Sequence, residues 1–213
     1  MSTRSKRRPY RPWRLYVIAD RSAAREKPLT EQVRAALEGG ADVIQLRDKK
    51  ASDLELLATA RALLEITKPK GIPLIINDRV QVARDSGADG VHLGQEDGSL
   101  EEARTVLGDQ AIIGRSTHNQ AQVLVAEAEG FDYIGVGPVF STPTKPTTVP
   151  VGLDLVRFAA ENIRIPFVAI GGIDLSNVEE VRRAGAKAVA VVRAVMADEN
   201  PKQAAEKLVE FLR

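Results

Sequence analysis

Two aspartates follow consecutive apolar segments of this sequence, at positions where together they could hold a divalent cation. Asp78 comes just after the apolar run Pro73–Ile76, and Asp97 comes just after Gly90–Leu93. Mg2+ prefers hard oxygen ligands and in enzymes takes one or two carboxylates together with phosphate oxygens of a substrate. Alone, Asp78 is equally well explained as the cap of a following helix, so the prediction depends on the pair. We predict Mg2+ binding by Asp78 and Asp97.

Three cations fall at comparable positions and indicate a polyanionic substrate. Arg47 and Lys49 follow the run Val43–Leu46, and Lys145 lies in the loop after Tyr133–Val136. Each alone would be an ordinary solvated surface charge, so only their convergence carries weight. An arginine fork suits two phosphate oxygens, and several cations with a metal ion can offset the charge of a departing diphosphate.

The two histidines of the chain are weaker candidates for chemistry. His92 lies inside an apolar run, which predicts a hydrogen-bonded core residue. His118 follows Ser116 and could either cap the next helix or contact a substrate. No serine or cysteine activated by a base is evident in the sequence, so nothing indicates covalent catalysis.

These polar residues follow short apolar runs that alternate with helical patterns. The runs are Leu15–Ala19, Val43–Leu46, Pro73–Ile76, Gly90–Leu93, Ala111–Gly114, Tyr133–Val136, Pro166–Ile170 and Ala188–Val192. The helical patterns cover about 30–38, 52–67, 79–86, 99–107, 119–129, 153–161, 175–184 and 201–212. Continuous apolar runs are typical of parallel strands buried on both faces. Eight such units predict an α/β fold, a single (β/α)8 TIM barrel, in preference to an open doubly wound sheet.

The barrel prediction gives meaning to a glycine pair at the end of the seventh run. At Gly171 and Gly172 backbone N–H groups can approach a phosphate closely, because no Cβ intervenes. A tight turn explains a glycine pair equally well, but the loops after the seventh and eighth strands commonly bind phosphate in such barrels. Val192 and Arg193, at the end of the eighth run, would complete this site.

Composition and charge limit the remaining possibilities. Of 213 residues 44% are hydrophobic and 28% charged, the net charge is +1, and no apolar run is long enough to span a bilayer. Six of the basic residues lie in residues 1–14, which we interpret as a solvated, disordered tail rather than a nucleic-acid-binding arm. Residues 15–213 would form the catalytic domain. The absence of cysteine permits a reducing compartment, and we expect a cytoplasmic protein that binds neither nucleic acid nor membrane.

Seven short motifs stand at the ends of the predicted strands. They are Gln45-Leu46-Arg47-Asp48-Lys49, Asn77-Asp78-Arg79, His92-Leu93-Gly94-Gln95-Glu96-Asp97, Gly114-Arg115-Ser116-Thr117-His118, Gly135-Val136-Gly137-Pro138, Thr142-Pro143-Thr144-Lys145 and Ile170-Gly171-Gly172-Ile173. In this order and combination they resemble the thiamine phosphate synthase family. The resemblance runs from about residue 15 to 212, and only the basic tail lies outside it.

The resemblance implies a Mg2+-dependent transferase of thiamine biosynthesis. It would couple 4-amino-2-methyl-5-hydroxymethylpyrimidine diphosphate with 4-methyl-5-hydroxyethylthiazole phosphate, giving thiamine phosphate and pyrophosphate. The implied reaction is dissociative: pyrophosphate leaves, a stabilised pyrimidine methyl cation forms, and the thiazole nitrogen captures it.

The resemblance also implies roles for individual residues. The pyrimidine diphosphate contacts would be Gln45, Arg47, Lys49, Asn77, Ser116 and Lys145, of which Arg47, Lys49, Ser116 and Lys145 would be catalytic. The thiazole phosphate contacts would be Thr142, Thr144, Gly172, Val192 and Arg193. Asp78 and Asp97 would be the Mg2+ ligands.

Two positions depart from the family pattern, and two other functions compete. Arg115 stands where a small apolar residue is usual, and Arg193 where serine is common. A related thiazole tautomerase would bind thiazole phosphate without coupling it, and a non-catalytic regulatory protein would bind thiamine phosphate. Neither has a departing diphosphate to neutralise, so the two aspartates with Lys49 and Lys145 favour the synthase. The sequence leaves homo-oligomerisation open.

Overall fold

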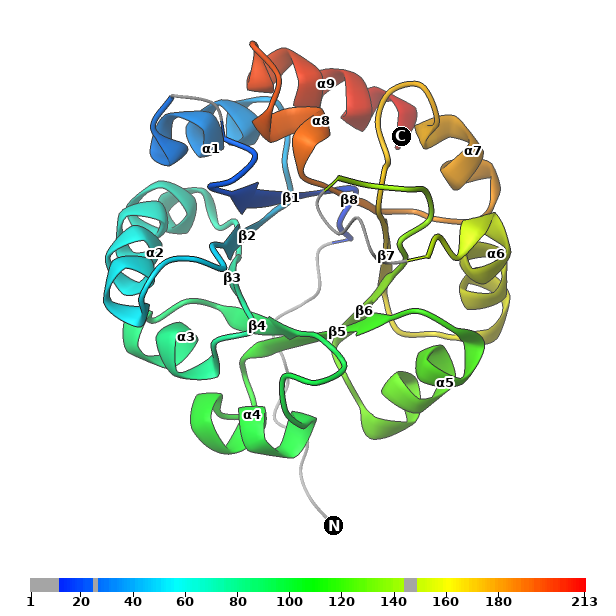
Figure 1. Ribbon diagram of the computed structural model, residues 1–213, viewed down its shortest axis with the longest axis horizontal. Helices are drawn as coiled ribbons and strands as arrows, with labels where there is room; N and C mark the ends of the chain where they lie inside the picture. Colours follow the sequence, from blue (N-terminus) through cyan, green and yellow to red (C-terminus); the bar gives the residue numbers. More distant parts are fainter. Residues whose placement is uncertain (1–11, 25–26, 144–148) are drawn as a thin grey trace.

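The computed structural model describes residues 12–24, 27–143 and 149–213, which form a closed barrel of parallel strands. The strands follow one another around the barrel in sequence order, and the eighth pairs with the first (Figure 1). They are β1 Leu15–Asp20, β2 Val43–Arg47, β3 Leu74–Asn77, β4 Gly90–Leu93, β5 Ile112–Thr117, β6 Tyr133–Val136, β7 Phe167–Ile170 and β8 Val189–Val191. The predicted (β/α)8 barrel is confirmed.

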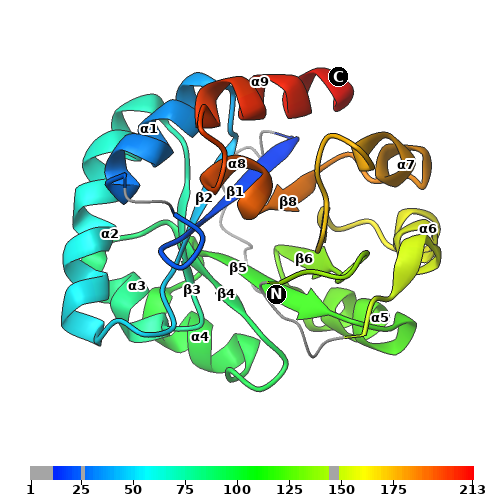
Figure 2. The same cartoon turned by 45° about the horizontal axis from the view of Figure 1, so that its top comes forward.

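Helices surround the barrel and cover its outer face (Figures 1 and 2). The main ones are α1 Leu29–Glu38, α2 Asp53–Thr67, α3 Val80–Ser86, α4 Leu100–Leu107, α5 Gln120–Glu129, α6 Gly152–Asn162, α7 Val178–Arg183 and α9 Pro201–Phe211. Two short helices, η1 Lys68–Lys70 and α8 Arg193–Met196, were not predicted. Helix α7 begins later than predicted, because the Asp174 carboxylate instead accepts hydrogen bonds from the backbone and hydroxyl of Ser176.

Aspartates that stand just before β2, β4 and β6 tie neighbouring strands together. Oδ2 of Asp42 accepts hydrogen bonds from the backbone N–H groups of Arg14 and Leu15, at 2.9 and 3.2 Å. Asp89 accepts one from Leu74, and Asp132 accepts one from Ile113. Each aspartate therefore joins the amino ends of two consecutive strands.

Two apolar layers hold the fold together. The larger lies between barrel and helices and includes Leu15, Val17, Ile44 and Leu46. The smaller fills the barrel interior, where Tyr16 and Tyr133 are almost completely buried. Gly114 makes room for the second tyrosine, because a Cβ at that position would lie 2.2 Å from the Tyr133 ring.

Trp13 closes the amino-terminal end of the barrel interior. It is 6% exposed and makes edge-to-face contacts with Tyr16 and Tyr133, with ring centroids 5.8 and 5.0 Å apart. Arg14 pairs with Asp42 through its side chain. Trp13 and Arg14 therefore pack as part of the barrel, and the predicted tail boundary after residue 14 is too late by two residues. Residues 1–11 of the predicted tail lie outside the described residues.

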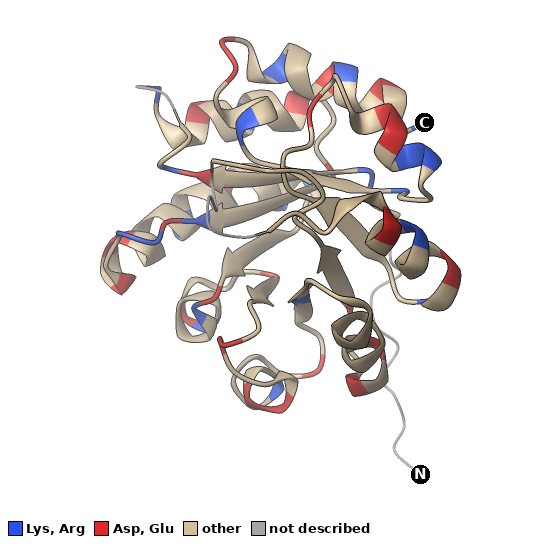
Figure 3. Cartoon of the chain, turned by 45° about the vertical axis from the view of Figure 1, so that its right-hand side comes forward, with Lys and Arg blue, Asp and Glu red and all other residues tan. Residues whose placement is uncertain are grey.

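Charged residues of both signs are spread over the helices and loops, whereas the strands carry few of them (Figure 3). Among the described residues, no helix is both long enough and apolar enough to cross a membrane.

Candidate active site

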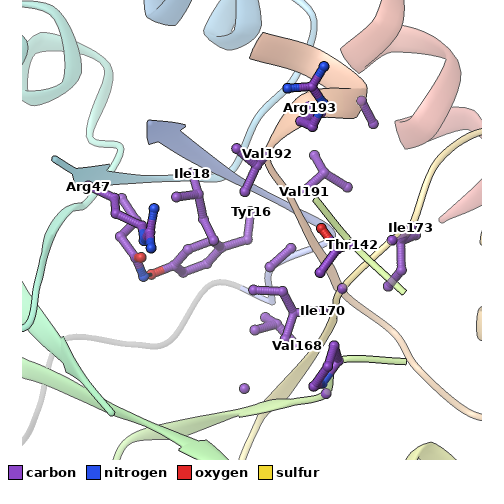
Figure 4. Close-up of a pocket in the computed structure, with 18 of the residues that line it drawn as sticks. Tyr16, Ile18, Arg47, Thr142, Val168, Ile170, Ile173, Val191, Val192 and Arg193 are labelled. Atoms are coloured by element: carbon purple, nitrogen blue, oxygen red, sulfur yellow. Dashed lines mark hydrogen bonds between the residues drawn. The ribbon is translucent and has the colours of Figure 1, made fainter. Parts of the chain in front are cut away.

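A cavity of about 500 Å3 opens at the carboxyl ends of the strands, where (β/α)8 enzymes place their chemistry. Polar side chains from several strands share it with apolar ones such as Ile18, Val168 and Ile170 (Figure 4). Of the predicted site residues, the cavity is lined by Gln45, Arg47, Asn77, Ser116, Thr142, Gly172, Val192 and Arg193. The structure therefore brings together residues predicted to bind the pyrimidine diphosphate and residues predicted to bind the thiazole phosphate.

Four of the residues predicted to contact the pyrimidine diphosphate stand on β2, β3 and β5. Gln45 and Arg47 are alternate residues of β2, and Asn77 ends β3. Ser116 stands on β5, which extends further than the predicted run. Because alternate residues of a strand face the same side, Gln45 and Arg47 both reach the barrel interior.

Arg47 is held by a buried carboxylate that the sequence analysis did not single out. Its Nη1 donates a hydrogen bond to Oδ2 of Asp20, the last residue of β1, whose side chain is 2% exposed. Asp20 also accepts hydrogen bonds from the backbone and hydroxyl of Ser22. The guanidinium therefore has a fixed position at the cavity, with further N–H groups to donate.

The two predicted metal ligands lie outside the cavity wall but close to one another. Asp78 follows β3 with φ of 61°, a left-handed conformation that is strained for a residue other than glycine. Its Oδ2 lies 2.5 Å from Nζ of Lys49, whose side chain is 56% exposed. Oδ2 of Asp97 accepts a hydrogen bond from the backbone N–H of Gly94 at 2.7 Å. The structure thus groups Lys49, Asp78 and Asp97, and does not place them on the cavity lining.

Electrostatics at this pair fit a divalent cation. Partial desolvation, together with the neighbouring carboxylate of Asp78, raises the pKa of Asp97. Two carboxylates that repel one another are the arrangement that a bound dication relieves. Among the described residues no group of three or more acidic, histidine or cysteine side chains could hold a metal. Mg2+ usually takes one or two carboxylates together with water and substrate oxygens, so a carboxylate pair suits this ion.

The residues predicted to bind the thiazole phosphate line the opposite part of the cavity. Figure 4 shows Arg193, Val192 and Thr142 to the right of Arg47. Arg193 is the first residue of α8. Thr144 and Lys145 lie outside the described residues.

Gly172 is required for a reason that the sequence did not reveal. With φ of 63°, a Cβ there would lie 2.6 Å from the backbone oxygen of Ser141 and 2.8 Å from Cβ of Phe140. The backbone of the β6–α6 loop is itself hydrogen-bonded across this junction, because Phe140 N–H donates to the Gly171 oxygen at 3.0 Å. Gly172 therefore allows the loop to pack over the end of β7.

A chain of hydrogen bonds crosses the floor of the cavity. Nε2 of Gln45 donates to Oη of Tyr16 at 2.7 Å, and the two tyrosine hydroxyls lie 2.9 Å apart. Nδ1 of His92 is 2.9 Å from Oη of Tyr133, and Nε2 of His92 is 2.9 Å from Oγ of Ser116. Burial raises the pKa of Tyr16, so this phenol keeps its proton at neutral pH. The prediction that His92 is a hydrogen-bonded core residue is confirmed.

His118 also lines the cavity, so of the two predicted alternatives the structure brings it to the site. Its Nδ1 lies 2.5 Å from the backbone oxygen of Gly137, which can only accept a hydrogen bond. Nδ1 therefore carries the proton.

The sequence analysis missed Tyr16, Tyr133 and Asp20. A signal existed for each. The tyrosines interrupt apolar strand runs, and a buried tyrosine hydroxyl usually has a polar partner. Asp20 follows the first apolar run directly, which is the position that identified Asp78.

Comparison with known proteins places the chain in a family. Residues 15–195 match the family model described as thiamine monophosphate synthase. A thiamine-phosphate synthase of Chloroflexus aurantiacus is 45% identical over 197 residues, 92% of this chain and 91% of the relative. One from Shouchella clausii is 44% identical over 200 residues, 93% of this chain and 96% of the relative.

Other relatives are longer. The thiamine-phosphate synthase of Thermosynechococcus vestitus is 49% identical over 184 residues, which are 86% of this chain but 52% of the relative. The chain therefore spans about half the length of that relative.

A solved structure agrees with the sequence comparison. Thiamine phosphate pyrophosphorylase from Pyrococcus furiosus has a TM-score of 0.85 and 40% identity, covering 94% of this chain and 95% of its own. A 3-hexulose-6-phosphate synthase, with a TM-score of 0.70 and 18% identity, shares the fold. From its family match, its relatives and its barrel, this chain belongs to the thiamine monophosphate synthase family.

Proposed function

We propose that the protein is a thiamine phosphate synthase, a transferase that couples the pyrimidine diphosphate with the thiazole phosphate and releases pyrophosphate. The observation that carries the proposal is the single cavity lined by residues of both predicted substrate halves, with a carboxylate pair and Lys49 beside it. Family membership supports the same activity. One cavity that accepts both substrates is what a coupling reaction requires, because the reacting atoms must meet.

The diphosphate half of the reaction is assigned to the β2–β4 side. Arg47, oriented by Asp20, would bind diphosphate oxygens, and Lys49 would supply a further positive charge. Asp78 and Asp97 would hold Mg2+, which supplies charge neutralisation to the departing pyrophosphate. Thr144 is assigned to the site from the family resemblance alone, and Lys145 from that resemblance and from its place in the sequence after the sixth apolar run.

The thiazole half is assigned to the loops after β6, β7 and β8. Thr142, Gly172, Val192 and Arg193 would hold the thiazole phosphate at this side of the cavity. The apolar side chains Ile18, Val168 and Ile170 would pack against the rings and limit the access of water to a pyrimidine methyl cation. Capture of the cation by the thiazole nitrogen needs only the correct position of the two rings.

Two other functions would use a similar cavity. A thiazole tautomerase needs a base but no metal, and His118 lies in the cavity. A regulatory protein that binds thiamine phosphate would need no metal either. The grouping of Lys49, Asp78 and Asp97 favours the synthase over both.

The deciding experiment incubates the purified protein with both substrates, with and without Mg2+, and measures thiamine phosphate and pyrophosphate. We expect equal amounts of the two products, only with Mg2+ present. Binding of thiazole phosphate without product, under conditions in which a known synthase turns over, would contradict the proposal. Conversion of a thiazole tautomer without pyrimidine diphosphate would instead establish the tautomerase.

We also propose that the protein acts in the cytoplasm on small phosphorylated molecules, without nucleic acid or membrane as a partner. The catalytic domain would then begin at Trp13, which packs with the barrel, and run to residue 213. Charges of both signs are mixed over the described helices and loops (Figure 3), which supports a small-molecule role.

A further inference from the structure

The contact between His92 and Ser116 allows two opposite chemistries. If Nε2 of His92 accepts a proton, Ser116 becomes an activated nucleophile, as in hydrolases that form covalent intermediates. If Nε2 donates, Ser116 keeps its own proton and can offer it to a ligand. The distance of 2.9 Å fits both, so the direction must come from the rest of the hydrogen-bond chain.

The direction is set at the Gln45 end. Nε2 of Gln45 can only donate, so Oη of Tyr16 accepts there. Tyr16 still has its own proton, and its hydroxyl is buried. Among the described residues the remaining neighbour of this hydroxyl is Oη of Tyr133, at 2.9 Å. Because an unsatisfied buried hydroxyl is costly, Tyr16 donates to Tyr133.

The same reasoning continues across the barrel. Tyr133 accepts from Tyr16, and its own proton is directed at Nδ1 of His92, 2.9 Å away. A neutral imidazole whose Nδ1 accepts carries its proton on Nε2. Nε2 of His92 therefore donates to Oγ of Ser116, at 2.9 Å.

We propose that the chain Gln45–Tyr16–Tyr133–His92–Ser116 has a fixed polarity that makes Ser116 a hydrogen-bond donor to the substrate and not a nucleophile. Tyr16, Tyr133 and His92 are positioning residues, because they act through Ser116. Ser116 Oγ accepts from His92 and directs its own proton into the cavity that it lines. At the other end of the hydrogen-bond chain, the side-chain amide of Gln45 donates a hydrogen bond to Oη of Tyr16. The side-chain oxygen of Gln45 remains available to accept a hydrogen bond from a ligand.

This polarity deepens the proposed function and rests on it where the substrate is concerned. The cavity then offers an acceptor at Gln45 and a donor at Ser116, which suits an aminopyrimidine, a ring with both amine donors and nitrogen acceptors. It also accounts for a reaction without a covalent enzyme intermediate, since His92 cannot remove the Ser116 proton.

Nitrogen-15 NMR of the two histidines tests the polarity without any substrate. At neutral pH, proton-coupled 15N spectra distinguish a protonated ring nitrogen from an unprotonated one, and a His118→Asn sample assigns the signals. We expect His92 to carry its proton on Nε2 alone. A proton on Nδ1, or protons on both nitrogens, would overturn the proposal.

Variants at two points of the hydrogen-bond chain test whether its members set the tautomer of His92 or merely support the fold. Tyr133→Phe removes the donor to Nδ1, so we expect the His92 signals to shift toward a mixture of tautomers. Ser116→Ala removes only the acceptor at Nε2, so the tautomer should persist. Unchanged His92 signals in Tyr133→Phe, or a switched tautomer in Ser116→Ala, would contradict the assigned direction.

Steady-state kinetics test whether the hydrogen-bond chain affects binding of the pyrimidine diphosphate. Tyr133→Phe should raise KM for the pyrimidine diphosphate about threefold to tenfold, the effect of one weakened hydrogen bond, and leave KM for the thiazole phosphate unchanged. Thr117→Val is the matched control, because Thr117 carries a buried hydroxyl on β5, the strand of Ser116. This hydroxyl donates to the Gly135 oxygen at 3.0 Å and lies outside the cavity lining. Equal changes for both substrates, or the same change in Thr117→Val, would overturn the link to the pyrimidine. If wild type couples no substrates, the proposed function fails, while the NMR result still decides the polarity.

Discussion

Nζ of Lys49 lies 2.5 Å from Oδ2 of Asp78, so a cation assigned to the diphosphate already neutralises a carboxylate assigned to the metal. Asp97 stands beside this pair and has no basic partner in a hydrogen bond or ion pair among the described residues, and its pKa is raised. Binding of Mg2+ with a diphosphate would satisfy both carboxylates and release Lys49 toward the phosphates. The pair is therefore a place where metal and substrate should bind cooperatively.

Replacing Asp97 tests the metal assignment. We expect Asp97→Asn to lower turnover on the order of 100-fold, because it removes a charged ligand from the ion that offsets leaving-group charge. The measurement is the Mg2+ dependence of steady-state coupling, with Asp109→Asn, an exposed aspartate, as control. Wild-type activity and metal requirement in Asp97→Asn would show that the two-carboxylate site is wrong.

Asp97→Asn should lower turnover but should not lower the stability of the metal-free protein. The folded pKa of Asp97 is raised, so the folded state binds its proton more readily than the unfolded chain does. The charged carboxylate therefore opposes folding above the unfolded pKa of about 4, and this cost is absent at lower pH. In metal-free protein, Asp97→Asn should melt no lower than wild type at pH 7, and the difference should vanish near pH 3. A lower melting temperature at pH 7 would contradict the repulsion.

Arg115 should position the loop that carries Asp97. Its guanidinium donates to the backbone oxygens of Gln95, at 3.0 Å, and Gly98, at 2.7 Å, and lies 5.5 Å from the centre of the Phe131 ring. Arg115→Met should lower the free energy of unfolding by about 1–2 kcal/mol and weaken Mg2+ binding roughly tenfold, because the loop loses both anchors.

Urea denaturation and calorimetric titration with Mg2+ and pyrophosphate measure the two effects of Arg115→Met. Arg157→Met is the control, since Arg157 forms an exposed pair with Asp154 within α6. Unchanged metal affinity would show that Asp97 is positioned without Arg115.

Two glycines with the same backbone conformation allow the cost of backbone strain to be distinguished from the cost of a steric clash at Cβ. Gly71 has φ of 65° and open space at its Cβ position, whereas Gly172 has φ of 63° and would meet Ser141 and Phe140. Gly71→Ala should cost about 1–2 kcal/mol from the left-handed backbone alone. Gly172→Ala should cost more, and should raise KM for the thiazole phosphate more than KM for the pyrimidine diphosphate, because the displaced loop carries Thr142.

Thermal unfolding and kinetics with each substrate varied in turn measure these effects. If Gly172→Ala were no more costly than Gly71→Ala, the loop contact would be wrong. If both KM values rose equally, the thiazole side would be wrongly assigned.

Trp13 should divide the amino-terminal segment into a dispensable and a required part. Trp13→Ala should lower the free energy of unfolding by about 3–5 kcal/mol, because it opens a cavity beneath Tyr16 and Tyr133. Removal of residues 1–12 should leave coupling and melting temperature nearly unchanged. A large loss on truncation would show that the basic segment also stabilises the barrel.

The sequence by itself determined the barrel and most of the residues around the cavity. Apolar runs that alternate with helical patterns leave little choice of fold, since parallel strands need helices on their exposed face. The carboxyl ends of parallel strands meet at one mouth, so the position of Arg47 directly after an apolar run was enough to predict it at the site. The family resemblance added Asn77.

The tertiary structure decided which side chains meet across the barrel. Tyr16, His92 and Tyr133 lie far apart in sequence, and only the closure and register of β1, β4 and β6 bring them into one hydrogen-bond chain. Strand patterns fix the face to which a side chain points, but not its partner on a strand across the barrel. For the same reason the contact of Asp20 with Arg47 and the hold of Arg115 on the Asp97 loop appear only in the folded chain.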